Sequence, residues 1–255
     1  SSRFGTALLG FLLSSLLKVK INLDIRDIFS DSLIVLSKRN LFLKIFTNVI
    51  RKVEKYVFKN SHSITYVSKG FHNDLNINSK KNILYIPNGI DKLFIEFSNC
   101  NFVKNSNPVE PFKVTYAGNI GYAQGLHHTI PKLAKYFDSQ LQFDIIGSGN
   151  AIALIKQSIY KMELNNIKII EPVNRKQLIN FYKNSDILFL QLNSEKAFQK
   201  VLPSKIFEYS VFDTPILAGV AGNARDFILK ELENSYIFTP NNLDEARFKI
   251  EQILG

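Results

Sequence analysis

The stretch Phe112–Gly121, with the sequence FKVTYAGNIG, runs from an apolar strand into a turn that contains two glycines. A helical pattern follows this turn from about Leu126. Glycine lets the backbone approach a ligand closely, and the start of a helix behind such a turn favours an anion. Tight turns between strand and helix also use glycine when no ligand binds, so this stretch by itself predicts only a strand–turn–helix unit.

Similar turns follow other apolar strands. Gly147 and Gly149 come after the strand that ends at Ile146, and a Gly-x-x-Gly turn at residues 219–222 closes a later strand. Ligands in open α/β sheets collect at the carboxyl ends of the strands. Several strand ends that carry glycine or polar loops therefore predict one shared binding site.

Short apolar runs, most of them separated by helical patterns, recur along the whole chain. We expect strands at Ile21–Ile25, Ser63–Val67, Ile83–Ile86, Phe112–Ala117, Leu141–Ile146, Ile167–Ile170, Ile187–Leu190, Pro215–Ala218 and Tyr236–Phe238. Because most of these runs are continuous rather than alternating, both faces of each strand should be buried, as in parallel sheets. The sequence therefore predicts an α/β fold with helices layered on parallel sheets.

A polar, proline-bearing segment divides the chain between Ser98 and Pro111. We expect a linker over residues 101–111, which separates two domains. Residues 112–255, with six predicted strands, form a complete doubly wound domain. Residues 1–100, with only three, look like the C-terminal part of a similar domain whose front would precede Ser1.

The composition narrows the classes of function. The 255 residues are 45% hydrophobic and carry a formal net charge of +10, which suits phosphorylated substrates, anionic membranes or nucleic acid. The sequence contains no recognisable nucleic-acid-binding motif, so no nucleic-acid partner is predicted. A single cysteine excludes an internal disulfide framework and fits a reducing, cytoplasmic compartment.

The segment Leu41–Phe58 reads as a basic amphipathic helix, with an apolar side that includes Phe46 and Val57 and a side rich in lysine. Such a helix can lie on anionic lipid. The same pattern also occurs on solvated faces of lysine-rich proteins, so both readings stay open.

The stretch Pro203–Tyr209, PSKIFEY, places Lys205 and Glu208 three residues apart at a helix start. The lysine and the helix N-terminus suit a phosphate, and the glutamate can accept hydrogen bonds from a pair of sugar hydroxyls. Together, the lysine, the helix N-terminus and the glutamate would hold a nucleotide sugar. The alternative is an ordinary helix start with Ser204 as its N-cap and a surface lysine.

Other polar groups follow the predicted strands. Asn119 and Gln124 could donate hydrogen bonds to a phosphate or sugar, and the backbone near Val173 could frame a base. Arg175 either faces solvent or contacts the phosphate or the base. In the first half, Arg26 and Asp27 stand at a strand end, where they form either part of a site or a structural ion pair.

Several motifs are missing from the sequence. It has no Asp-x-Asp, no zinc-type His/Cys spacing, no phosphate-binding loop with Lys-Ser/Thr and no Gly-x-Ser-x-Gly elbow. We therefore expect no metal and no cofactor apart from a nucleotide-sugar substrate.

Taken in order, these motifs resemble family 4 of the retaining glycosyltransferases with the GT-B fold. The stretches that carry the resemblance are Ile25–Asp27, Tyr66–Ser68, Ile86–Asp91 (IPNGID), Tyr116–Gly121 (YAGNIG), Gly147–Gly149 and Pro203–Tyr209. The chain is especially similar to bacterial enzymes that transfer N-acetylfucosamine or related N-acetylamino sugars in O-antigen or capsule synthesis.

The resemblance implies two Rossmann-like domains, with the donor held mainly by the second domain. Glu208 matches the second glutamate of the family's Glu-x7-Glu motif, which binds the donor ribose, and Lys200 stands where the first glutamate would be. Arg26 and Asp27 match a region where many members place a His-Asp pair. The predicted catalytic residues are Arg26, Asp27 and Lys205. The predicted donor-binding residues are Gly118, Asn119, Gly121, Gln124, Gly147, Gly149, Val173, Arg175, Lys200, Ser204, Lys205, Ile206 and Glu208.

The expected function is metal-independent transfer of an N-acetylated amino sugar from a UDP-sugar to a lipid-linked saccharide. The expected place is the cytoplasmic face of the cell membrane, where the enzyme would be peripheral. Two alternatives remain open, a GT-B-like UDP-sugar epimerase and a non-catalytic fragment that binds nucleotide sugars.

Overall fold

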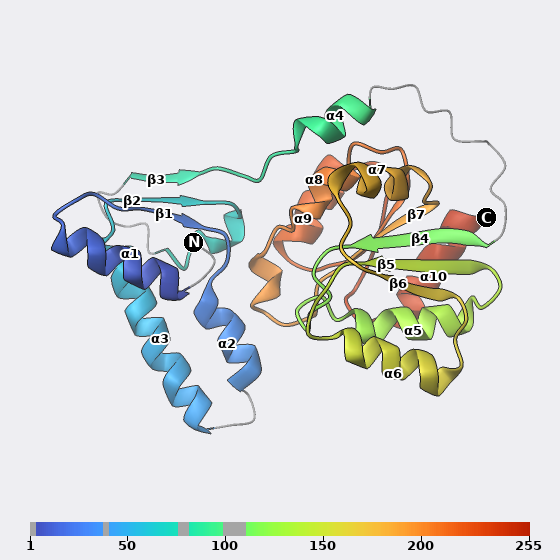
Figure 1. The fold of residues 1–255 in the computed structure, drawn as a ribbon, viewed down its shortest axis with the longest axis horizontal. Helices are drawn as coiled ribbons and strands as arrows, with labels where there is room; N and C mark the ends of the chain where they lie inside the picture. Colours follow the sequence, from blue (N-terminus) through green and yellow to red (C-terminus); the bar gives the residue numbers. More distant parts are fainter. Residues whose placement is uncertain (1–3, 38–40, 76–81, 99–110) are drawn as a thin grey trace. The chain divides into compact units, whose positions relative to one another are not determined.

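The structure is a computed structural model that describes residues 4–37, 41–75, 82–98 and 111–255. It divides into two compact units (Figure 1). Unit 1 comprises residues 1–88 and 195–202, and unit 2 comprises residues 89–194 and 203–255. Each unit has its own parallel sheet and its own core.

Unit 1 is a three-stranded sheet with helices. Its elements are α1 (Phe4–Leu16), β1 (Asn22–Ile25), α2 (Phe29–Ser37), α3 (Leu41–Asn60), β2 (Ser63–Tyr66), the 3-10 helix η1 (Lys69–Phe71), β3 (Asn82–Tyr85) and the 3-10 helix η2 (Phe198–Lys200). The strands are parallel in the order β1-β2-β3.

The core of unit 1 lies between this sheet and its helices. Leu23 and Ile25 of β1 pair in register with Ile64 and Tyr66 of β2, and all four side chains are buried. The period of two places them on one face, and Val57 of α3 belongs to the same core. Ala7 of α1 and Phe58 of α3 belong to this core too, so both helices pack against the sheet side of unit 1 (Figure 1).

Unit 2 is a larger α/β layer structure. Its elements are α4 (Lys92–Ser98), β4 (Phe112–Ala117), α5 (Leu126–Tyr136), β5 (Leu141–Ile146), α6 (Ile152–Met162), β6 (Ile167–Ile170), α7 (Arg175–Lys183), β7 (Ile187–Gln191), α8 (Lys205–Tyr209), β8 (Ile216–Gly219), α9 (Asn223–Glu231), β9 (Ser235–Phe238) and α10 (Leu243–Leu254). The six strands are parallel in the order β6-β5-β4-β7-β8-β9.

Helices cover both faces of this sheet. Helices α5, α6 and α10 pack on one face, and α7, α8 and α9 lie on the other (Figure 1). Strand β7 is buried along its whole length, as expected for a central strand between two helical layers. The nine predicted strands and the α/β fold with parallel sheets are thus confirmed.

The boundary between the units differs from the predicted linker. Helix α4 belongs to unit 2, because Phe94 packs against the rings of Tyr182 and Phe212. Most of the predicted linker, residues 101–110, lies outside the described residues. A second difference is segment 195–202, which lies between β7 and α8 in the sequence but belongs to unit 1.

Candidate functional site

The order of strands in unit 2 identifies where a ligand should bind. From β4 the chain adds β5 and β6 on one side, and then crosses to build β7, β8 and β9 on the other side. The connections after β4 and β7 therefore diverge at the carboxyl ends of these two strands. Open α/β sheets bind their ligands in the crevice at such a switch point.

A pocket of about 340 Å³ lies at these strand ends. It is lined by Ala117, Gly118, Asn119, Ile146, Gly147, Ser148, Pro172, Val173, Leu178 and Lys205. The lining comes from the ends of β4 and β5, the loop after β6, helix α7 and the start of α8. Five predicted donor-binding residues are thus brought together: Gly118, Asn119, Gly147, Val173 and Lys205. The volume is in the range of small-molecule sites.

The two glycine loops form one wall of this pocket because they pack directly on each other. The Gly118 N–H donates to the Ile146 carbonyl at 2.9 Å, and the Ile120 N–H donates to the Ser148 carbonyl at 2.8 Å. Gly147 has a φ of +142°, and a Cβ there would collide with the backbone oxygen of Gly118. Only glycine fits this approach, so these turns have a structural need for glycine besides any contact with a ligand.

Gln124 shapes the loop after β4. Its Oε1 accepts hydrogen bonds from the Gly121 N–H and from Asn119 Nδ2, both at 3.1 Å. The buried Gln191 at the end of β7 donates through Nε2 to the carbonyls of Gln124 and Gly125. These bonds hold the loop in one conformation before any ligand arrives. No local motif in the sequence identifies Gln191 as part of the site.

Lys205 provides the positive charge at the pocket. Its Nζ lies 2.6 Å from Glu208 Oε2, and both side chains are about one-fifth exposed. The Tyr182 hydroxyl donates to the same carboxylate oxygen at 3.4 Å. Burial raises the pKa of Tyr182, so its hydroxyl remains protonated and able to donate. Lys205 and Glu208 therefore form a partly exposed ion pair beside the pocket.

The helix that carries them is short. Helix α8 has only five residues, and the Ser204 side chain makes no capping hydrogen bond to it. A single turn aligns few peptide dipoles, so its N-terminus contributes little field. Tyr209 ties this turn to the sheet, because its buried hydroxyl donates to the Phe189 carbonyl and accepts from the Ala117 N–H. The phosphate prediction consequently rests on Lys205.

Other predicted donor-binding residues have structural partners. Ile206 has a buried side chain, and its N–H donates to the Pro203 carbonyl. Gly149 packs against the backbone of Ile120. Arg175 forms an ion pair with Asp91 near the start of α4. The roles of these residues toward a donor stay predictions.

The predicted pair of Arg26 and Asp27 does not form in the structure. The Arg26 guanidinium pairs with Asp24 at 2.8 Å, and both side chains are exposed. Strand β1 ends at Ile25, so Arg26 and Asp27 lie in the connection between β1 and α2 rather than on the strand. Asp27 instead accepts a hydrogen bond from the Ser32 hydroxyl, and burial raises its pKa.

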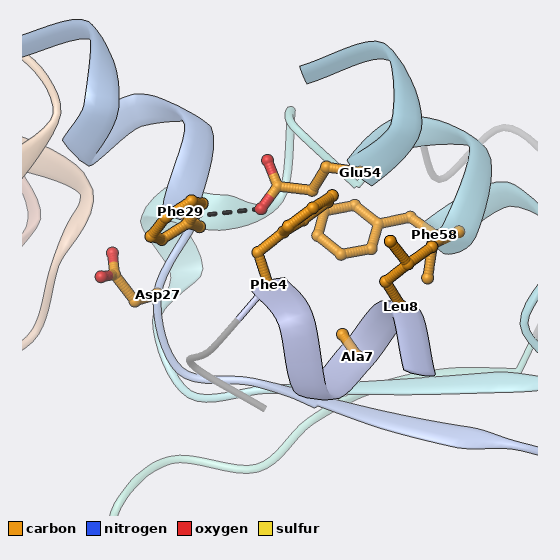
Figure 2. A pocket seen from close by; sticks show the side chains of 8 residues that line it. Phe4, Ala7, Leu8, Asp27, Phe29, Glu54 and Phe58 are labelled. Atoms are coloured by element: carbon orange, nitrogen blue, oxygen red, sulfur yellow. Dashed lines mark hydrogen bonds between the residues drawn. The ribbon is translucent and has the colours of Figure 1, made fainter. Parts of the chain in front are cut away.

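Asp27 lies beside a small apolar cavity in unit 1 (Figure 2). Phe4, Phe29 and Phe58 line the cavity, whose volume of about 10 Å³ is close to that of one water probe. The neighbouring Glu54 caps α2, because its carboxylate accepts hydrogen bonds from the N–H groups of Phe29 and Ser30. This cavity therefore reads as part of the packing of α1, α2 and α3.

Lys200 is held within unit 1. Its Nζ lies 2.7 Å from Asp31 Oδ2 and 2.8 Å from Asp74 Oδ2. Its predicted contact with the donor sugar stays a prediction. Within residues 4–37, 41–75, 82–98 and 111–255, the structure contains no group of three or more His, Cys, Asp or Glu side chains that could hold a metal ion.

The structure resembles solved glycosyltransferases with the GT-B fold. The complex of Anabaena HepE with UDP and glucose matches with a TM-score of 0.71 and 17% identity, over 98% of this chain and 66% of that one. Sucrose-phosphate synthase from Thermosynechococcus elongatus matches with a TM-score of 0.75 and 14% identity, over 98% and 62%. The chain thus spans less than two thirds of the length of either protein.

The match to a third solved structure includes a smaller share of that protein's chain. This structure is that of a point mutant of S. aureus TarM in complex with fondaparinux, α-GlcNAc-glycerol and UDP, with a TM-score of 0.61 and 17% identity over 80% of this chain and 40% of that one. A comparison with curated proteins found no match.

The match to a family model extends over more than half of the chain. Residues 99–255 match the model described as glycosyl transferases group 1. This range contains the strand-end pocket, Lys205 and Glu208. The α/β fold with parallel sheets and the GT-B resemblance predicted from the motifs are confirmed. The chain therefore belongs to the group 1 glycosyltransferase family.

Proposed function

We propose that this protein transfers an N-acetylated amino sugar from a UDP-sugar to a lipid-linked saccharide, in the synthesis of a bacterial surface polysaccharide such as O-antigen or capsule. Membership of the family supports the transferase reaction. The HepE structure contains UDP, and the TarM structure contains UDP together with α-GlcNAc-glycerol, which favours a UDP donor. The amino sugar and the acceptor come from the motif resemblance.

The proposal of a donor site rests on one observation: Lys205 lines the strand-end pocket, and its Nζ lies 2.6 Å from Glu208 Oε2. A lysine at a pocket with exposed backbone loops suits a diphosphate, and a carboxylate one turn away suits the ribose hydroxyls. The backbone near Val173 lies in the same lining and can frame the base. Lys205 and Glu208 would then exchange their mutual contact for contacts with the donor.

The proposed chemistry places the cation where charge develops. As the bond from the sugar to UDP breaks, negative charge accumulates on the departing β-phosphate, and Lys205 stabilises it in the transition state. The reaction then proceeds without a divalent metal, because the lysine carries out this role. The resemblance to retaining glycosyltransferases also leads us to propose that the transferred sugar keeps its configuration. Arg26 and Asp27 are proposed to act on the acceptor side.

The test is calorimetric titration of UDP into the full chain and its variants. Lys205→Met and Glu208→Gln are each expected to weaken the Kd at least tenfold, because a charge-assisted hydrogen bond contributes about 1.5–3 kcal/mol. Lys156→Met and Glu233→Gln remove the same charges from exposed positions of unit 2 and should leave the Kd unchanged. EDTA should not change the Kd either.

The outcomes separate the proposal from its alternatives. Equal affinity for UDP in the wild type and in both site variants would contradict a donor site at Lys205 and Glu208. An epimerase would alter the donor sugar without any acceptor, so analysis of UDP-sugars after incubation with the protein distinguishes it. A non-catalytic fragment would bind UDP but release none from UDP-sugars.

The proposal includes an anionic membrane as partner, at the cytoplasmic face of the cell membrane. Helix α3 buries Thr47, Glu54, Val57 and Phe58, whereas Phe46 of the predicted apolar side is exposed. The helix leaves a second apolar strip exposed, with Phe42 85% and Phe46 55% exposed, beside exposed lysines. An exposed apolar strip next to a cationic strip suits an interfacial helix. No helix among the described residues has the length and hydropathy of a membrane span.

Vesicle flotation tests this part of the proposal. The wild type should bind vesicles with 30% phosphatidylglycerol better than pure phosphatidylcholine, and salt should weaken the binding. The double variant Phe42→Ser/Phe46→Ser should lose most of it. Tyr160→Ser, which removes an equally exposed aromatic ring from unit 2, is the control. Unchanged binding by the double variant would exclude α3 as the membrane contact.

A further inference from the structure

Segment 195–202 has an unusual place in the chain. The chain leaves unit 2 after Ser194, belongs to unit 1 from Glu195 to Leu202, and returns to unit 2 at Pro203. Helix α8 begins two residues after this return, at Lys205. A residue of extended chain spans at most about 3.6 Å. The segment, which ends at Leu202, and Lys205 of the donor pocket therefore cannot lie far apart.

The side chain of Lys200 holds this segment through charge. Its Nζ contacts the carboxylates of Asp31 and Asp74, whose side chains are only 9% and 21% exposed. Arg51 also pairs with Asp31, at 3.4 Å. Burial disfavours the charged form of Lys200, but hydrogen bonds and attraction from the two aspartates outweigh it and raise its pKa. Removal of the ammonium group would leave two partly buried carboxylates with less compensation.

The backbone of Lys200 is held as well. The Ser68 hydroxyl donates a hydrogen bond to the Lys200 carbonyl, and Gly70 lies against the Lys200 backbone so closely that a Cβ would collide with it. The next residue, Val201, packs against the core of unit 1. Lys200 is therefore fixed by its side chain, its carbonyl and its neighbour at once.

We infer that Lys200 is a positioning residue rather than a donor ligand: it fixes segment 195–202 on unit 1 and so restrains the start of the helix that carries Lys205 and Glu208. This inference rests on the proposed function for its effect on turnover. Its structural part, the anchoring of the segment, stands independently of any substrate.

Hydrogen exchange of residues 195–202 tests the anchoring. In Lys200→Met the amides of the segment should exchange at least tenfold faster than in the wild type, and Asp74→Asn should have the same effect with the lysine still present. Lys196→Met removes the same charge from an exposed position of the same segment and should change nothing. Lys200→Arg keeps the ion pairs and should restore slow exchange. Wild-type exchange in both Lys200→Met and Asp74→Asn would overturn the inference.

Two further measurements separate positioning from direct contact. The ratio of the affinities for UDP-N-acetylglucosamine and UDP should not change in Lys200→Met. A fall in this ratio would show contact with the sugar and overturn the inference.

The kcat for UDP release from the same donor should fall at least fivefold in Lys200→Met, with KM within twofold of the wild type, and Lys200→Arg should restore it. An unchanged kcat would refute the functional part. Failure of the wild type to bind UDP would refute the proposed function instead, while hydrogen exchange would still decide the anchoring.

Discussion

At the scale of single residues, the candidate donor pocket depends on a few side chains that have two tasks. Lys205 pairs with Glu208, which also accepts from Tyr182, so the carboxylate is oriented before a nucleotide arrives. Gly118 and Gly147 bring two loops together and leave their backbone at the pocket. Such prior ordering lowers the entropy cost of binding.

Gly147→Ala should damage this wall of the pocket. The new Cβ would collide with the Gly118 carbonyl, and the φ of +142° disfavours any side chain. We expect the free energy of unfolding to fall by about 2 kcal/mol, measured by urea denaturation, and the affinity for UDP to fall with it. In Gly89→Ala the Cβ would have no neighbour within 4 Å, so its stability should match the wild type. Equal stability of both variants would show that the loops can separate freely.

The Asp27 carboxyl should make stability depend on pH. Burial raises its pKa in the folded state, so the neutral form is favoured there, and the stability it contributes is lost as the pH rises above the unfolded pKa of about 3.9. Asp27→Asn should therefore melt at a higher temperature than the wild type at pH 7, and the difference should shrink toward pH 4. Melting curves at both values check this, with the exposed Asp138→Asn as control. A difference that grows on acidification would contradict the sign.

Residue types and spacing were enough to single out Lys205, Glu208, Gly118 and Gly147 as candidates, because each is part of a local motif, and the structure places Lys205, Gly118 and Gly147 in the lining of one pocket. Their partners could not be found in the same way. Tyr182 is 26 residues away from Glu208, and no local pattern links a tyrosine on α7 to a carboxylate on α8. The sequence places Arg26 beside Asp27, but in the structure its guanidinium pairs with Asp24.

At the scale of elements, strand β7 organises the loop after β4. Gln191 ends this strand in a fully buried position, and its amide group holds two carbonyls of the loop, those of Gln124 and Gly125. The position of β7 in the sheet therefore helps to fix the conformation of the loop after β4, which lines the pocket. The apolar runs predicted the strands themselves, whereas the length of α8 and the attachment of α4 depended on packing.

Gln191→Leu should loosen this loop. The substitution leaves two carbonyls without their donor in a buried place, which should lower the free energy of unfolding by about 2 kcal/mol. Hydrogen exchange at residues 121–125 should become faster, and urea denaturation reports the loss of stability. Gln157→Leu, at an exposed position of α6, is the matched control. Normal exchange in the loop would mean that Gln124 alone is sufficient to hold it.

At the scale of the whole molecule, the chain consists of two units with separate cores, and the residues that line the candidate donor pocket all belong to unit 2. Segment 195–202 breaks the simple correspondence between sequence order and unit. The match to the family likewise begins at residue 99, near the start of unit 2. The two units are therefore expected to respond differently to a nucleotide.

UDP should stabilise unit 2 selectively. A ligand at 100 times its Kd adds about 2.7 kcal/mol to the stability of the part that binds it. Hydrogen exchange in β4, β5 and β7 should slow on addition of UDP, while exchange in β1 and β2 should stay the same. The Lys205→Met variant should show a much smaller effect at the same UDP concentration. Equal protection of both sheets would show that the units unfold together.

The sequence by itself determined the nine strands, their parallel arrangement in α/β layers and the strand ends at which a ligand should bind. These features depend on runs of apolar residues and on glycine turns, which act over a few neighbouring residues. The tertiary structure decided which charges meet: Lys200 with Asp31, 169 residues apart, Arg175 with Asp91, and segment 195–202 with unit 1. Such pairs form only when the packing of distant elements brings them within a few ångströms, and no local pattern encodes that distance.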